Sequence, residues 1–221
     1  MTQDCRTGEA PTAGRRRTAT VLAVWPFLLA ALACTPEEDP PRSSEGGAGA
    51  SGLEVEPVQY TAEGTGYALL EPGAEIELWG APQGGHWSRV GAQVRGLDSK
   101  TVRLVARWKD AESGSILVEA ERTSPMVPVP GSAGWMQPDP TSMYNVAHLP
   151  LCPSDAKDGA QGVERVLEVE VTELYDDFES GVSAVKVVPR CGQAPGPLLD
   201  YCKCECGPDY LPGKCVSGFP G

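Results

Sequence analysis

The sequence predicts an all-β protein, an immunoglobulin-like antiparallel β-sandwich with a short disulfide-rich tail at its C-terminal end. Hydrophobic and polar residues alternate with a period of two, and no window of eleven residues shows a clear helical face. Turn-forming residues separate the alternating segments. Five of the eight cysteines follow residue 190, which indicates a tail held by cross-links rather than by a core.

The alternation places the strands. In 102–108, Val102, Leu104, Ala106 and Trp108 share one face, so Trp108 is expected in the core. By the same pattern we expect strands at 54–60, 74–79, 90–95, 102–108, 116–121, 144–151, 167–172 and 182–189.

Three short segments between strands predict hairpins, namely 96–100, 110–114 and 176–181. Residues 124–143 carry five prolines, which are excluded from central strands, so a long crossover at the edge of the sandwich is expected there. A binding loop is the alternative, because long loops are often functional.

The N-terminus predicts export. Residues 15–17 are three arginines, and 21–33 is an apolar run of 13 residues, too short to span a bilayer. We expect four regions: a signal peptide at 1–33, a lipidated Cys34 with a flexible Pro/Gly/Ser tether at 34–52, a β-domain at 53–190 and a Cys-rich tail at 191–221.

Ala30-Ala31-Leu32-Ala33-Cys34 resembles the lipobox of bacterial lipoproteins, with Ala31 where that motif most often has Leu. The resemblance implies a diacylglyceryl group on Cys34, whose acyl chains would hold the protein on a membrane. Pro36, at a position where inner-membrane lipoproteins often have Asp, favours the outer membrane. Plain secretion is the alternative, because Ala31-Leu32-Ala33 also fits an ordinary cleavage site.

The charge argues against a nucleic-acid partner. The chain has 18 Lys+Arg against 30 Asp+Glu, a net charge of -12. Removal of residues 1–33 deletes four basic and two acidic residues, and -12 - 4 + 2 gives -14. A protein that binds its partner through phosphates needs clustered Lys and Arg side chains, and this chain is acidic. The expected partners are the membrane, through the lipid, and an envelope protein or polysaccharide.

Six cysteines remain after cleavage and lipidation, and in an exported chain they predict up to three disulfides: Cys152, Cys191, Cys202, Cys204, Cys206 and Cys215. Cys152 and Cys191 end strands and are expected to be close. Zinc or copper held by the C-x-C-x-C thiolates with His86 or His148 is the alternative, although no cofactor or metal is expected. Residues 204–215 resemble the last loop of an EGF-like module, which implies a Cys206–Cys215 bond.

Catalytic motifs such as H-E-x-x-H, G-x-S-x-G and a P-loop are missing from the sequence, which favours a non-catalytic protein. An envelope hydrolase or metal-binding protein would use His86, His148 and loop carboxylates at 155–158 or 176–179. A carbohydrate-binding or adhesion module would use Trp79, Trp87 and Trp135, which are expected to be exposed.

Residues 84–98, 135–153 and 187–191, together with the Cys-rich end, resemble surface lipoproteins of myxobacteria. These families have no characterised activity, so the resemblance implies a Gram-negative outer-membrane location alone. The expectation is therefore a non-catalytic lipoprotein that acts as a binding or structural module of the cell envelope.

Overall fold

The structure, a computed structural model, describes residues 52–61, 66–153, 159–175 and 179–215. The expected signal peptide, Cys34 and almost all of the tether lie outside these residues. No helix in the described part of the chain is long and apolar enough to cross a membrane.

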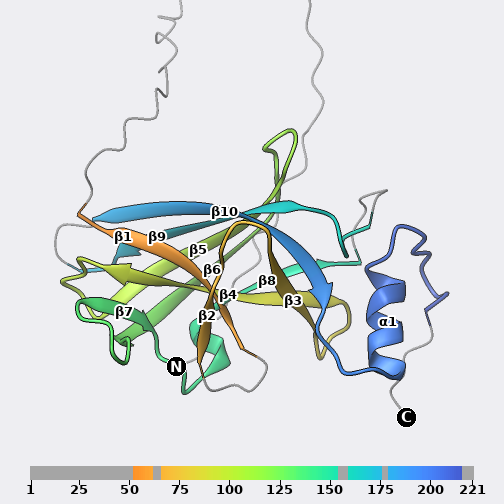
Figure 1. Ribbon diagram of the computed structural model, residues 1–221, viewed down its shortest axis with the longest axis horizontal. Coiled ribbons are helices and arrows are strands. Elements are labelled where there is room, and N and C mark those ends of the chain that lie inside the picture. The colour runs from red at the N-terminus through yellow and green to blue at the C-terminus, as the bar shows by residue number, and fades with distance from the viewer. Residues whose placement is uncertain (1–51, 62–65, 154–158, 176–178, 216–221) are drawn as a thin grey trace, which may run out of the picture. The chain divides into compact units, whose positions relative to one another are not determined.

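Strands dominate the described residues (Figure 1). The elements are β1 (Glu54–Tyr60), β2 (Tyr67–Leu69), β3 (Ala74–Gly80), β4 (His86–Arg95), β5 (Thr101–Asp110), β6 (Ile116–Pro128), β7 (Trp135–Pro138), a 3-10 turn (Met143–Asn145), β8 (Ala147–Cys152), β9 (Arg165–Glu173), β10 (Ser180–Cys191) and α1 (Pro197–Glu205).

Seven of the strands close into a barrel. The order within the sheet is β2-β1-β4-β3-β10-β9-β5-β6-β7, and β7 also pairs with β4. The ring therefore runs from β4 through β3, β10, β9, β5, β6 and β7 back to β4. Strand β4 has four partners because it is ten residues long: its first half pairs with β3 and β8, and its second half pairs mainly with β1 and β7.

The all-β class is confirmed, but the immunoglobulin-like sandwich is wrong. Strand β10 runs parallel to β3, with Val187 opposite Ala74, and the pairing of Val94 with Met136 closes the sheet. An alternation of period two is the same in a sandwich and in a barrel. Closure depends on pairing between segments distant in the sequence, which the alternation does not encode.

Two of the three predicted hairpins form, β5–β6 around 110–114 and β9–β10 around 176–181. The hairpin predicted at 96–100 is wrong, because β4 and β5 pair with other strands. The carboxylate of Glu173 accepts hydrogen bonds from the backbone N–H groups of Asp98 and Ser99, at 2.7 and 2.9 Å. This buried glutamate therefore fixes the connection in place of a strand partner.

The proline-rich segment is not a crossover loop. Strand β6 continues through Pro125 to Pro128, and β7 follows it. The hydrogen bonds of the strand at this point are made by other groups. The carbonyl of Pro125 accepts from the N–H of Asp139 (2.9 Å), and the N–H of the next residue, Met126, donates to the carbonyl of Lys100 (2.8 Å). Proline is tolerated where the strand requires no N–H. The prolines of residues 124–143 therefore did not exclude strands, and the predicted crossover is wrong.

The core confirms the expected inward face of β5. Trp108 is fully buried, as are Leu104 and Ala106 beside it. Buried residues from the neighbouring strands complete the same cluster, including Ile76, Leu78, Val90, Leu149, Leu167 and Val187.

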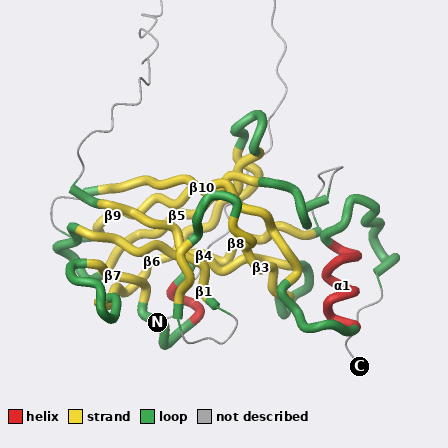
Figure 2. The backbone as a smooth tube through the Cα atoms, viewed as in Figure 1, coloured by secondary structure: helices red, strands yellow, loops and turns green. Residues whose placement is uncertain are grey.

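The tail contains the only helix of the described residues that exceeds one turn, although no helix was expected. Helix α1 begins after Gly196, with Pro197 in its first turn, where a missing N–H costs nothing. Figure 2 shows it beside the strands at one end of the fold. Nine residues are too few for a stable isolated helix, so tertiary contacts must hold it.

Candidate binding pocket

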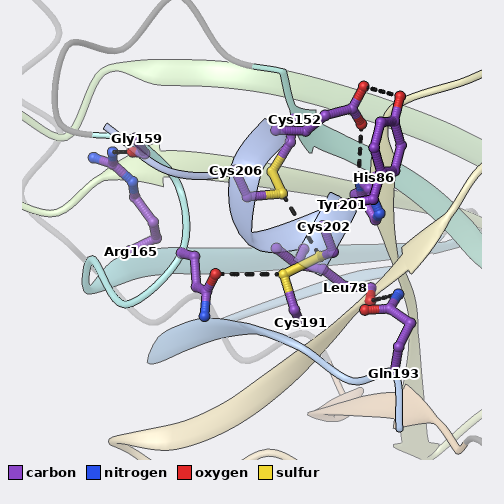
Figure 3. The surroundings of a disulfide bond; sticks show 12 residues. Leu78, His86, Cys152, Gly159, Arg165, Cys191, Gln193, Tyr201, Cys202 and Cys206 are labelled. Atoms are coloured by element: carbon purple, nitrogen blue, oxygen red, sulfur yellow. Dashed lines mark hydrogen bonds and ion pairs between the residues drawn. A yellow bond between two sulfur atoms is a disulfide. The ribbon is translucent and has the colours of Figure 1, made fainter. Parts of the chain in front are cut away.

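Three disulfides hold the tail. Two of them join the α1 segment to strands of the sheet, Cys152–Cys206 to the end of β8, which pairs with β4, and Cys191–Cys202 to the end of β10. Cys204–Cys215 closes a loop within the tail. Figure 3 shows the two bonds to the sheet on adjacent turns of the helix. Pairing of the six cysteines is confirmed, and it indicates an oxidising extracellular or envelope location.

The predicted pairing of Cys206 with Cys215 is wrong. Cys152 and Cys191, which were expected to be close, are bonded to Cys206 and Cys202, and the sulfur atoms of those two partners lie 4.0 Å apart. Cys202 and Cys206 are four residues apart on α1, so both lie on the face turned to the barrel and are buried. Cys204 lies between them on the exposed side of the helix, where Cys215 reaches it. The helix, which the sequence pattern did not reveal, decides the pairing.

A cavity of about 400 Å³ lies between the β3–β4 hairpin and the tail. One side comes from Trp79, Gly80 and His86 of the hairpin, and the other from Gln193, Leu198 and Tyr201. Most of this lining is apolar or aromatic, with a few polar groups, which is the usual composition of a small-ligand site.

A cluster of three polar side chains adjoins the pocket, where His86 and Tyr201 line the cavity and Glu205 contacts both of them. The Nδ1 atom of His86 lies 3.0 Å from Oε2 of Glu205, though without the alignment of a full hydrogen bond. The hydroxyl of Tyr201 donates to the other carboxylate oxygen. His86 and Glu205 are only 3% and 7% exposed, so β4 and α1 meet at this polar cluster almost without water.

The pKa values of this cluster follow from burial and from the carboxylate. Burial lowers the pKa of His86, and the charge of Glu205 opposes that shift in part. The hydrogen bond to Glu205, with burial, raises the pKa of Tyr201 to about 12. Burial therefore favours the uncharged imidazole, and the phenol keeps its proton near neutral pH.

The three tryptophans do not form one platform. Each is half-buried rather than exposed, and Trp79 alone lines the pocket. Trp87 is the cross-strand partner of Trp79 but packs on the ring of His148, at 4.4 Å between centroids. Trp135 pairs with Arg95 at the opposite end of β4, about 25 Å from Trp87 at the rise of a β-strand.

His148 lies away from the pocket. Its Nε2 atom is 2.8 Å from the carbonyl of Met143, and its ring lies between those of Trp87 and Tyr144. Its contacts are therefore those of a packed structural residue. Of the loop carboxylates considered from the sequence, those at 155, 158, 176 and 177 lie outside the described residues.

The metal alternative has a partial counterpart in the fold. The ligand atoms of His86, Cys202 and Cys206 lie within 4.8 Å of one another. Both sulfurs belong to disulfides, however, whereas zinc and copper bind the free thiolate. In the disulfide-bonded chain, His86 is the one member of this cluster with a ligand atom in a form that binds metal.

The two histidines predict how stability depends on pH. Burial lowers the pKa of His148 as it does that of His86. A lowered pKa means that the unfolded chain binds protons more readily below its ordinary value of about 6.5. Their contribution to stability is complete above that value and is lost as the pH falls through it.

We therefore expect the melting temperature to fall from about pH 7 to about pH 5. His148→Gln, which lies outside the pocket, should reduce this dependence, as measured by calorimetry across that range. An identical pH profile in the variant would show that His148 titrates alike in the folded and unfolded chains.

Sequence reasoning found Trp79 and His86 but missed Gln193, Tyr201 and Glu205. A signal was present: Tyr201–Glu205 and Cys202–Cys206 each have the spacing of four that brings side chains together on a helix, after a proline that favours a helix start.

The fold and the pocket define a class, a nearly all-β barrel with a disulfide-held helical tail and a ligand-sized cavity between them. No family model matches this sequence, and none of the curated proteins matches it either. Among solved structures, fusolin from spindles of a Wiseana spp. entomopoxvirus is similar over 68% of this chain, with 15% identity and a TM-score of 0.34. The match spans about half of the fusolin chain (54%) and supports no inference about function.

Proposed function

We propose that the protein is a non-catalytic binding module of the bacterial cell envelope, attached to the outer membrane by acyl chains on Cys34. The pocket between the β3–β4 hairpin and the tail is its ligand site. The observation that carries this proposal is a cavity whose walls come from Trp79, Leu198 and Tyr201 and which adjoins buried polar groups. Such a combination of apolar walls with few polar atoms is characteristic of small-ligand sites.

The attachment is tested by Cys34→Ala. We expect the unchanged protein to sediment with outer membranes and to carry a diacylglyceryl mass on Cys34. The variant is expected in the soluble fraction without that mass. Soluble, unmodified protein from the unchanged sequence would show plain secretion instead.

The pocket is tested by filling it. Leu198 lines the cavity from α1, and Leu211 is a similarly exposed leucine of the same tail that does not line it. We expect small neutral ring-containing fragments to bind the unchanged protein and Leu211→Trp, and to bind Leu198→Trp at least about tenfold more weakly, as measured by ligand-observed NMR. Absence of fragment binding, or equal binding by all three proteins, would contradict a ligand site here.

The alternative is an envelope hydrolase, which the contact between Glu205 and His86 favours. A carboxylate beside Nδ1 orients an imidazole so that Nε2 acts as a general base. The lining of the pocket includes no serine, threonine or free cysteine, so the base would have to activate water. This alternative requires turnover of an ester or amide panel that His86→Gln abolishes while the melting temperature is kept.

A further inference from the structure

We propose that the ligand of this pocket is a single neutral sugar ring, held by two hydrogen-bond acceptors and by two aromatic side chains. This inference rests on the proposed function, since it names the chemistry of the ligand for the same cavity.

The first acceptor is the imidazole of His86. We assign the proton of the neutral ring to Nδ1, which lies 3.0 Å from the carboxylate of Glu205, and the lone pair to Nε2. Nε2 is turned toward Gly80, another residue of the lining, because a Cβ atom built on Gly80 would lie 3.9 Å from it. A ligand hydroxyl near Gly80 would therefore meet an acceptor.

The second acceptor is the side-chain carbonyl of Gln193. The amide nitrogen of this residue donates to the carbonyl of Leu78 (2.9 Å), which sets the orientation of the amide. Its Oε1 atom is buried and has no hydrogen-bond partner in the described structure. A buried acceptor without a partner costs free energy, and a ligand donor at this position removes that cost.

The aromatic contacts come from Trp79 in β3 and Tyr201 in α1, both of which line the cavity. The guanidinium carbon of Arg89 lies 4.1 Å from the centroid of the Trp79 ring, so the indole is already held in place. The Tyr201 hydroxyl is held by Glu205. Rings fixed before binding lose little entropy when an apolar sugar face packs on them.

The charges around the pocket favour a neutral ligand over a cation. An aromatic face attracts a cation, but the cation Arg89 already lies against Trp79. The guanidinium of Arg89 is positive and the carboxylate of Glu205 is negative, so neither sign of charge dominates around the cavity. Hydroxyl groups donate to both acceptors without adding a charge. An ammonium group or a carboxylate would add one.

The size of the cavity favours one ring over a polymer. About 400 Å³ is near the lower end of the range for ligand pockets, about 300–1,000 Å³. We therefore expect monosaccharides, or the terminal residue of a glycan, to fill the site.

Gly80→Ala tests the proposal without disturbing the fold. The added methyl group would lie at van der Waals distance from Nε2 of His86, and Gly80 has no positive φ to strain. Gly66→Ala is the matched control, because a Cβ there has no neighbour within 4 Å and Gly66 is outside the pocket. Calorimetric titrations use the exported protein with its disulfides intact and a panel of neutral hexoses, N-acetylhexosamines, cationic hexosamines and apolar ring fragments.

We expect at least one neutral sugar to bind, Gly80→Ala to weaken it about tenfold or more, and Gly66→Ala to leave it unchanged. Binding of apolar fragments without binding of any neutral sugar would overturn the sugar proposal and leave the ligand site standing. Stronger binding of the cationic hexosamines than of their neutral counterparts would also overturn it. If nothing in the panel binds, the proposed function fails as well.

Discussion

Replacing both Cys152 and Cys206 by alanine is expected to lower the free energy of unfolding by about 4 kcal/mol, the chain-entropy value for a cross-link that closes a loop of this length. The two residues are 54 positions apart, and their bond joins the end of β8 to the end of α1. Chemical denaturation without reductant, followed by tryptophan fluorescence, measures the change.

The same substitution should also abolish ligand binding, because it releases the end of the helix that carries Glu205. The matched control is the double substitution of Cys204 and Cys215, whose bond lies within the tail and joins it to no strand. We expect that variant to keep both the unfolding transition of the barrel and the pocket. Equal losses in the two variants would show that the whole tail, rather than its attachment to β8, supports the fold.

Gly85→Ala is expected to destabilise the protein by about 2–5 kcal/mol, the sum of backbone strain and a steric clash. Gly85 has a φ of +77°, and a Cβ atom there would lie 2.5 Å from the carbonyl oxygen of Cys152. That carbonyl belongs to backbone, so the conflict requires β4 and β8 to separate. A shift there also moves Cys152 and, through its disulfide, the tail.

The neighbouring glycine separates the two causes. Gly84 has a φ of +97°, but a Cβ there would have no neighbour within 4 Å. Gly84→Ala therefore reports backbone strain alone, which is about 1–2 kcal/mol. Thermal unfolding of both variants measures the difference. Equal destabilisation would show that the close approach of Gly85 to β8 is not a tight constraint.

The Cys152–Cys206 bond and Gly85 connect the stability of the protein to its pocket. The β3–β4 hairpin supplies one wall and the tail supplies the other, and both are held at the end of β8. A binding site built from two attached pieces needs rigid joints, because a shift of about 1 Å is enough to weaken a positioned contact. In this protein the Cys152–Cys206 bond holds the tail, and the close approach of Gly85 to the carbonyl of Cys152 holds the hairpin.

Parts of the site were within reach of sequence reasoning. The six cysteines and the apolar run at the N-terminus predicted cross-links and export, and Trp79 and His86 were candidate ligand contacts. Gln193 was not. Tyr201 and Glu205 had the spacing of four after Pro197 as a signal, but the tail has little apolar content, and no amphipathic pattern marks its short helix. The disulfides, instead of a hydrophobic face, stabilise that helix.

The sequence by itself determined the all-β class, the inward face of β5 with Trp108, and the presence of disulfides among Cys152 and the five cysteines of the tail. These follow from local spacing and from the chemistry of single residue types. The tertiary structure alone decided the closure of the barrel, which cysteine pairs with which, and the meeting of His86 with Glu205. Each of these is a contact between segments far apart in the chain, and period-two alternation is compatible with many such pairings.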